Sequence, residues 1–246
     1  MSSLHGFVAT GSKCLDRVLG GGVPFGFLSL VFGESGTGKT TLAMQCAVNH
    51  VKDGNTAIYV DSSRQFSLDR LSQIVFGDLK SVASSIMIVT PRTFQEQGET
   101  IETLGNFISP RTRFVVFDTI SSLYSLELTD RKGTFRLNRE MNMQLAMLAE
   151  VAKREEIAVL ITSQVRSVLE ERQVLGKRSI EPVAARLLGF WPDLILHFGP
   201  TDNPRTKRVE LTKSPYIKPS SSHCLLELTD SGIQDQSNLG SLTKTY

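Results

Sequence analysis

Cysteine is scarce in this sequence, with three residues among 246: Cys14, Cys46 and Cys224. They lie far apart, are odd in number and have no metal-ligand spacing. This pattern argues against a disulfide framework and against a zinc site. We expect reduced thiols, with a role in the core, in a cytoplasmic protein.

Long apolar runs and an excess of one charge are also missing. No stretch approaches the ~20 apolar residues that a membrane span requires, and no basic-plus-apolar signal segment opens the chain. Lys and Arg number 27 against 25 Asp and Glu, which gives a net charge of +2. We therefore expect a soluble protein that is not secreted and has no membrane partner. Any contact with nucleic acid must come from local basic patches.

What is present is an alternation of apolar, strand-length runs with segments of helical spacing. The strand-length runs cover residues 28–32, 56–60, 86–89, 114–117 and 158–161. The helical segments cover residues 12–19, 40–51, 68–74, 99–108 and a long helix that Asn138 could cap. This order predicts an α/β fold, with a mainly parallel sheet flanked by helices on both faces.

The end of the sequence has a different pattern. Residues 193–198, 207–212 and 223–228 have strand character without helices between them, and Pro, Asn and Gly residues supply the turns. We expect antiparallel strands at the C-terminal edge of the sheet. The length suits one core domain, residues 1–233, and residues 234–246 are polar enough to form a disordered tail.

A glycine-rich motif lies between a predicted strand and a predicted helix. The sequence Gly-Glu-Ser-Gly-Thr-Gly-Lys-Thr matches the P-loop pattern in full. Glycines let backbone N–H groups converge on phosphate oxygens, and the helix start adds the positive end of its dipole. Lys39 can reach the β- and γ-phosphates, and the Thr40 hydroxyl can hold Mg²⁺. We therefore predict that ATP with Mg²⁺ is bound by Gly33, Glu34, Ser35, Gly36, Thr37, Gly38, Lys39, Thr40 and Thr41.

A second metal-binding group is expected at the end of another strand. The apolar run 114–117 is followed directly by Asp118. We assign Asp118 to the water shell of Mg²⁺. The simpler alternative is a strand-end Asp that caps the next turn.

With these motifs in place, the chain resembles the RecA/RadA recombinase core, a RecA-like P-loop NTPase core. More closely, it looks like the RadB family, the short archaeal paralogues of RadA. The resemblance runs from about residue 10 to residue 233. The segments that carry it are residues 10–16, 19–22, 59–66, 69–71, 123–127, 137–140, 161–165 and 230–233, together with Trp191.

The resemblance implies three further nucleotide-site residues. Arg70 matches the arginine that lies against the adenine ring. Gln164 matches the residue that senses the γ-phosphate and couples it to a DNA loop. Lys213 matches a basic residue that faces nucleotide held by a neighbouring subunit. Each has a simpler alternative: a solvated helix charge, a tie between strand ends, and an ordinary surface lysine.

The sequence departs from the family where its active ATPases carry a catalytic glutamate. Ser63 occupies that position, and a serine hydroxyl is too weakly basic to activate water. Asp61 and Glu34 are the nearest carboxylates in the sequence. We therefore predict ATP binding with at most very weak ATPase activity, and no autonomous strand exchange. Residues 7–10 match the family's subunit-docking motif poorly, so we expect no long filaments without a partner.

Two basic stretches match the positions of the family's DNA loops. The first loop combines basic side chains with an aromatic ring, which suits single-stranded DNA. Its candidate residues are Arg131, Lys132, Phe135, Arg136 and Arg139. The second, residues 166–186, includes Lys177 and Arg178. Both could instead be merely solvated surface loops.

These observations favour a RadB-like, ATP-binding and DNA-binding accessory protein of homologous recombination and DNA repair, with a RadA-type recombinase as a possible partner. One alternative is a signalling ATPase or autokinase like those of the KaiC group, whose usual carboxylate pair is replaced here by Ser62 and Ser63. A small-molecule P-loop kinase is another, if the second basic loop served as its arginine-rich lid.

Overall fold

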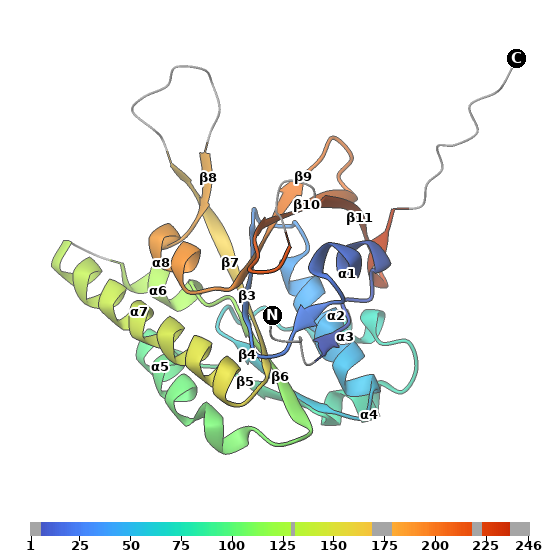
Figure 1. The fold of residues 1–246 in the computed structure, drawn as a ribbon, viewed down its shortest axis with the longest axis horizontal. Helices are drawn as coiled ribbons and strands as arrows, with labels where there is room; N and C mark the ends of the chain where they lie inside the picture. The colour runs from blue at the N-terminus through green and yellow to red at the C-terminus, as the bar shows by residue number, and fades with distance from the viewer. Residues whose placement is uncertain (1–5, 129–130, 169–178, 218–222, 237–246) are drawn as a thin grey trace, which may run out of the picture.

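A single large sheet organises the computed structural model, which describes residues 6–128, 131–168, 179–217 and 223–236 (Figure 1). Its strand order is β12-β11-β10-β9-β3-β7-β6-β4-β5, and β8 pairs with β7 beyond that row. A separate two-stranded sheet joins β1 (Phe7–Val8) to β2 (Val23–Pro24). The predicted α/β fold is confirmed.

Six parallel strands form the centre of the large sheet. They are β3 (Leu28–Gly33), β4 (Thr56–Asp61), β5 (Ile86–Val89), β6 (Thr112–Asp118), β7 (Ala158–Val168) and β9 (Leu194–Pro200). All of the predicted strand-length runs lie in these strands. Because the strands are parallel, their carboxyl ends meet at one edge of the sheet, where ligands bind in folds of this kind.

The antiparallel edge is also confirmed. Strands β10 (Thr206–Lys213), β11 (His223–Thr229) and β12 (Gly232–Asp235) follow β9 in order. Strand β12 carries the ordered sheet two residues past the expected boundary at residue 233. The Asp235 carboxylate accepts hydrogen bonds from the Ser12 hydroxyl and from the backbone N–H of Cys14, so this end of the sheet is tied to the first helix.

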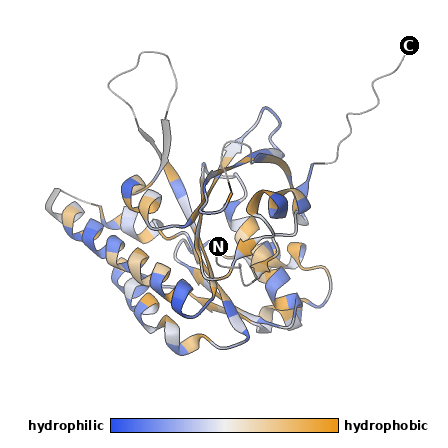
Figure 2. Ribbon diagram, viewed as in Figure 1, coloured by the Kyte–Doolittle hydropathy of each residue, from blue (hydrophilic) through white to orange (hydrophobic). Residues whose placement is uncertain are grey.

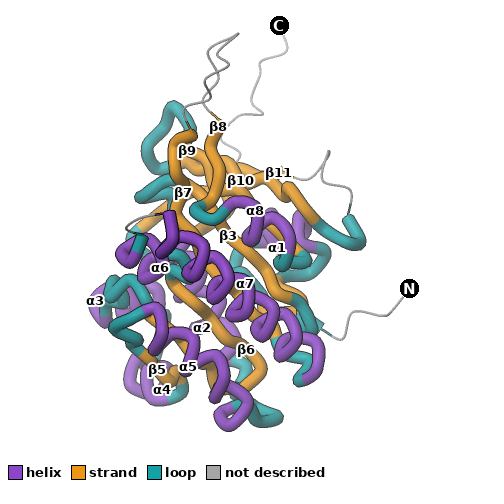
Figure 3. Tube along the Cα trace, turned by 90° about the vertical axis from the view of Figure 1, so that its left-hand side faces the viewer, coloured by secondary structure: helices purple, strands orange, loops and turns teal. Residues whose placement is uncertain are grey.

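Helices cover both faces of the sheet (Figures 1 and 3). One face carries α1 (Lys13–Leu19), α2 (Lys39–Lys52), α3 (Leu68–Ile74) and α4 (Leu79–Ser84). The other carries α5 (Phe94–Thr103), α6 (Ser122–Glu127), α7 (Arg131–Arg154) and α8 (Ala185–Phe190). No helix in these described ranges is both long enough and apolar enough to cross a membrane.

Alternating side chains of the central strands build two cores. In β6, Phe114 and Val116 pack towards α2, whereas Val115 and Phe117 pack towards α7. Figure 2 shows the resulting pattern, with hydrophobic strands inside and hydrophilic outer helix faces. Cys46 and Cys224 are buried in the core on the α2 side, and Cys14 is partly exposed.

Helix α5 begins five residues before the predicted start at residue 99. The Thr93 side chain accepts a hydrogen bond from the Glu96 N–H at 3.1 Å and so caps the helix there. After Thr103 the chain tightens into a 3-10 turn, Leu104–Phe107. The predicted segment 99–108 therefore combined the end of one helix with a different local structure.

The prediction that Asn138 caps the long helix was wrong. Helix α7 begins at Arg131, and the Asn138 side chain instead accepts a hydrogen bond from the Tyr124 hydroxyl at 2.8 Å. Leu137 is buried and extends the apolar stripe of Met141 and Leu145 towards the N-terminus. The first basic stretch, residues 131–139, is thus the start of a helix and not a loop.

The second basic stretch is not a simple loop either. Strand β7 continues to Val168 and pairs antiparallel with β8 (Ser179–Pro182), which projects from the body of the molecule (Figure 1). Helix α8 follows directly. Lys177 and Arg178 lie outside the described residues.

Candidate nucleotide-binding site

The P-loop connects the carboxyl end of β3 to the start of α2. Two of its glycines are required by the backbone. A Cβ on Gly33 would lie 2.1 Å from the carbonyl oxygen of Phe198 on the neighbouring strand. Gly36 has a φ of +74°, which favours glycine. The conformation of the loop therefore favours glycine at both positions.

The Lys39 ammonium is folded back over this loop. Its Nζ donates hydrogen bonds to the carbonyl oxygens of Gly33 at 2.8 Å and Glu34 at 2.7 Å. Burial lowers the pKa of Lys39 to about 8, and the negative charges of Asp118 and Glu34 oppose that change in part. Among the described residues, the Lys39 ammonium donates hydrogen bonds only to these two backbone carbonyls. A buried cation with such partners is well placed to exchange them for an anion.

A pocket of about 230 Å³ opens beside Lys39. The P-loop and α2 contribute Ser35, Gly36, Gly38, Lys39, Thr40 and Thr41. The opposite wall is formed by Gln65, Thr119, Gln164 and Leu228. The structure therefore brings together most of the predicted phosphate-binding residues and Gln164, which pairs with Gly33 in the sheet register.

Sequence reasoning missed three residues of that opposite wall. Gln65 and Thr119 each follow the carboxyl end of a parallel strand, β4 and β6, and such ends meet at the same edge of the sheet. That placement could have identified both. Leu228 comes from the antiparallel edge, and no sequence motif predicts that it lines the pocket.

Asp118 is fully buried at the end of β6. Its two carboxylate oxygens accept hydrogen bonds from two hydroxyls, those of Tyr59 at 2.8 Å and of Thr162. Burial, and next the Asp118 charge, raise the pKa of Tyr59 well above its ordinary value, so this tyrosine stays a hydrogen-bond donor. The carboxylate is held by neighbouring strands, and in the described part of the chain it accepts no hydrogen bond from an N–H of the following turn.

The donor set fits Mg²⁺ held mainly by phosphate oxygens and water. In the described part of the chain, no three His, Cys, Asp or Glu side chains gather as a metal cluster. Thr40 supplies a hydroxyl at the pocket wall, and Asp118 supplies a fixed charge at an adjacent strand end. Mg²⁺ commonly binds nucleotides with so few protein ligands.

Ser63 follows β4, and its backbone N–H donates to the Asp118 carbonyl at 3.2 Å. The nearby Asp61 is committed to the same turn. Its carboxylate accepts hydrogen bonds from the backbone N–H groups of Gln65 at 3.1 Å and Phe66 at 2.9 Å, and from the Ser63 hydroxyl at 3.2 Å. Asp61 therefore acts as a structural cap for this turn and is poorly placed to replace a missing base.

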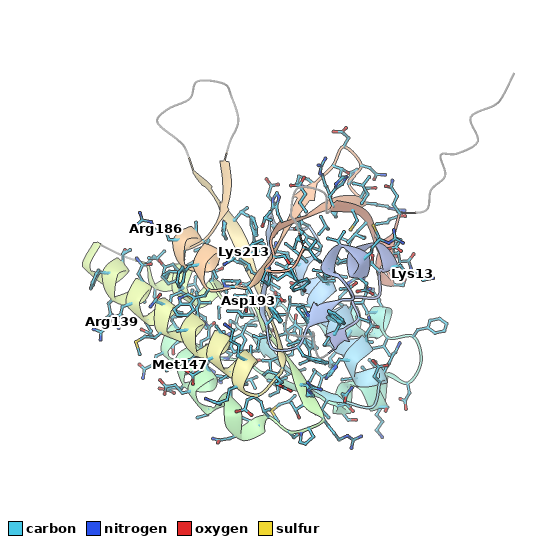
Figure 4. The ribbon with its side chains drawn as sticks, in the orientation of Figure 1. Lys13, Arg139, Met147, Arg186, Asp193 and Lys213 are labelled. Carbon is cyan, nitrogen blue, oxygen red and sulfur yellow. The ribbon has the colours of Figure 1, made fainter. Side chains whose placement is uncertain are left out.

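Arg70 and Lys213 lie in different parts of the fold. The Arg70 guanidinium donates to the carbonyl oxygens of Thr229 at 2.9 Å and Asp230 at 2.6 Å, and lies 3.5 Å from the Thr41 hydroxyl beside the pocket. Lys213 pairs with Ile195 near the other end of the sheet, and its Nζ caps α8 through the carbonyls of Gly189 and Phe190 (Figure 4). The structure does not bring Lys213 to the P-loop pocket of its own chain.

The candidate DNA-contacting residues that can be described lie on the outer side of α7. Phe135 is 76% exposed, and Arg136 and Arg139 are exposed on the same stretch of helix, whereas Leu137 is buried. Figure 4 shows Arg139 on the same side of the molecule as Arg186 of α8. Arg131 and Lys132 form the start of α7.

The fold and the position of the P-loop together define a RecA/Rad51-like α/β core. The family model described as Rad51 matches residues 5–236. The chain is 32% identical over 234 residues to "DNA repair and recombination protein RadB" from Thermococcus gammatolerans, covering 94% of this chain and all of that protein. The protein of the same name from Archaeoglobus fulgidus is 31% identical over 230 residues, covering 92% of this chain and 97% of that protein.

A solved structure gives the same answer. "Crystal structure of the RadB recombinase" superposes with a TM-score of 0.77 at 29% identity, covering 93% of this chain and 99% of that chain. The chain belongs to the Rad51 family, within its RadB group.

Proposed function

We propose that this protein binds ATP with Mg²⁺ in the pocket between the P-loop and Gln164. The observation that carries the proposal is Lys39, a buried ammonium beside a pocket lined by the glycine-rich loop. The Thr40 hydroxyl would hold the cation, with Asp118 acting through water. When bound, Mg²⁺ would neutralise charge on the phosphates. The backbone N–H groups of residues 35–40 would hold the phosphate oxygens.

We further propose that ATP hydrolysis is very slow. Ser63 stands at the position where a catalytic glutamate is expected, and Asp61 is occupied as the cap of the same turn. Loss of a positioned base costs ~10²–10⁴-fold in rate. The bound nucleotide then serves to hold the core in one state, with Gln164 contacting its phosphate end.

The setting of this activity is DNA recombination and repair. The support is membership of the Rad51 family and the names of the RadB relatives. Single-stranded DNA would run across the exposed face of α7, where Phe135 can stack a base and Arg136 and Arg139 can contact phosphates. The β7–β8 hairpin would extend this surface.

The protein would act as an accessory factor of a RadA-type recombinase and would not form long filaments by itself. Phe7, the aromatic residue of the poorly matched docking segment, is engaged within its own chain. It lies in β1, opposite Pro24 of β2, and its ring packs against Gly21. That arrangement supports a segment used internally rather than one presented to a neighbouring subunit.

The test is steady-state ATP turnover of the wild type, Ser63→Glu and Ser63→Gln, with and without single-stranded DNA. Glu restores a carboxylate at the proposed base position, whereas Gln matches its shape without basicity. We expect the Glu variant to hydrolyse ATP at least about tenfold faster than the other two. Rapid turnover by the wild type, at the rate of an active recombinase, would refute the proposal.

A further inference from the structure

A second pocket, of about 450 Å³, lies beside the P-loop pocket and shares two lining residues with it, Gln65 and Gln164. We call it the arginine–serine pocket, because its lining includes Arg64, Arg92 and five serines. The serines come from the turn after β4 and from the start of α6. None of the described residues that line it carries a carboxylate.

The side chains of its two arginines are exposed. Within the described ranges, neither guanidinium lies within ion-pairing distance of a carboxylate. The nearby acidic groups bind backbone instead. Glu96 accepts from the Arg92 N–H at 2.7 Å, and Glu127 accepts from the Phe94 N–H at 2.9 Å. Asp61 caps the turn that contains Arg64, as described above. The pocket therefore presents positive charge that these acids do not pair.

The Ser62 hydroxyl provides independent support for a ligand. Ser62 is only 3% exposed and lines this pocket, yet its Oγ has no hydrogen-bond partner among the residues that the structure describes. A buried hydroxyl without a partner destabilises the folded state. Such groups are rare in folded proteins, and a ligand that supplies an acceptor would remove the cost.

The backbone of Arg64 fits the same interpretation. Its φ is +55°, in the left-handed region that glycine and asparagine adopt most easily. An arginine held there carries backbone strain, and such strain concentrates at binding sites. The Ser63 N–H bond to Asp118 and the Asp61 cap fix this turn, so the guanidinium is directed from a rigid support.

We propose that the arginine–serine pocket binds a phosphate group. The guanidinium groups and hydroxyls of the pocket supply hydrogen-bond donors. The oxygens of a phosphate group supply acceptors, in a geometry that matches the planar guanidinium of arginine. Two sources share this chemistry: free inorganic phosphate, and a backbone phosphate of single-stranded DNA. Because Gln164 and Gln65 line both pockets, a phosphate here would lie on the far side of these glutamines from the P-loop.

The experiment uses the Lys39→Ala protein, so that anion binding at the P-loop does not mask the second pocket. Inorganic phosphate is titrated by calorimetry, and a fluorescent oligothymidylate is titrated by anisotropy. Arg92→Ala and Arg64→Ala are added singly. Arg17→Ala, an exposed arginine of α1 outside the pocket, is the matched control. If Lys39→Ala does not fold, the same arginine variants are examined in the otherwise unchanged chain, where the number of bound phosphates is counted.

We expect Arg92→Ala to weaken phosphate binding by about tenfold, as loss of a charge-assisted hydrogen bond would. The Arg17→Ala control should leave it unchanged. Weakening of oligothymidylate binding as well, with competition by inorganic phosphate, identifies a DNA backbone phosphate as the source. Weakening of phosphate binding alone identifies free phosphate. If neither arginine variant changes either affinity, or if the Lys39→Ala protein binds neither probe, the proposal is overturned.

Ser62→Ala separates a ligand-binding role from a structural one. Removal of a hydroxyl without a partner should leave the unfolding midpoint of the free protein unchanged or raise it, while phosphate binding weakens. A lower midpoint with unchanged phosphate affinity would contradict the proposal. Because this test does not use ATP binding, its failure and a failure of the proposed ATP site would be told apart.

Discussion

Replacing Lys39 with Met should stabilise the free protein at neutral pH. Lys39 is only 7% exposed, and burial lowers its pKa from the ordinary 10.5 to about 8. Burial thus penalises the protonated form in the folded state. Methionine fills similar space without a charge, so the variant removes this penalty.

The magnitude follows from the pKa change. A change from 10.5 to about 8, at 1.36 kcal/mol for each pKa unit, corresponds to about 3 kcal/mol. The variant also loses the hydrogen bonds to the Gly33 and Glu34 carbonyls, which together contribute about 2 kcal/mol. The net gain is about 1 kcal/mol, or about 2–4 °C in Tm for a chain of this size.

The difference in stability between the wild type and Lys39→Met should also depend on pH. The folded pKa lies below the unfolded one. Below pH 8 both states carry the proton, so the penalty in the wild type is constant. Between pH 8 and about 10.5 the unfolded chain binds more protons than the folded chain, so the stability contribution of Lys39 rises with pH. The advantage of Lys39→Met at pH 7 should therefore disappear by pH 10.

Thermal unfolding of the wild type and Lys39→Met, at pH 7 and pH 10, measures both effects. Addition of ATP with Mg²⁺ at about a hundred times the wild-type Kd should stabilise the wild type by about 2.7 kcal/mol, and Lys39→Met, which should bind at least about tenfold more weakly, by no more than about 1.4 kcal/mol. The order of stability should thus reverse when nucleotide is added. A variant less stable than the wild type at pH 7 without nucleotide, and equally so at pH 10, would refute the reasoning.

Two other regions give sharp expectations. Gly33→Ala should lower the free energy of unfolding by about 3 kcal/mol or more, because its Cβ would lie 2.1 Å from the Phe198 carbonyl oxygen. Gly36→Ala, with no atom within 4 Å of its Cβ, should lower the free energy of unfolding by only about 1 kcal/mol, as measured by denaturant unfolding. If both variants lost the same free energy of unfolding, the packing argument would be contradicted. Arg136→Ala with Arg139→Ala should reduce the salt dependence of single-stranded DNA binding by about 1.4 in log–log slope. The control is Arg154→Ala, which removes an arginine paired with Glu150 and Glu155 at the other end of α7 and should not change that slope. An unchanged slope in the double variant would show that α7 lies outside the DNA interface.

The central strands and the P-loop could be predicted from the sequence, because local signals specify them. Strands such as β4 and β6 are buried on both faces and appear as continuous apolar runs. The caps of helix α1 are equally local, since the Ser12 side chain accepts a hydrogen bond from the Leu15 N–H and Gly20 adopts a φ of +75°. These features depend on neighbours within a few residues.

Features that depend on distant contacts were not predictable. The start of α7 was placed too late, because the Asn138 side chain binds Tyr124 and is not a cap. The cap that Lys213 provides to α8 joins residues more than 20 positions apart. The arginine–serine pocket is lined by four separate segments of the chain, and no spacing of residues in the sequence predicts that they meet.

The most direct test of the account is a calorimetric titration of ATP with Mg²⁺ into the wild type and Lys39→Ala. In our proposal, the loop from Gly33 to Thr40 binds the triphosphate, and the Lys39 ammonium exchanges its two carbonyl partners for phosphate oxygens. We predict that the wild type binds one ATP per chain and that Lys39→Ala binds at least about tenfold more weakly, as loss of a charge-assisted hydrogen bond requires. Equal ATP affinity in the two proteins would contradict the central claim.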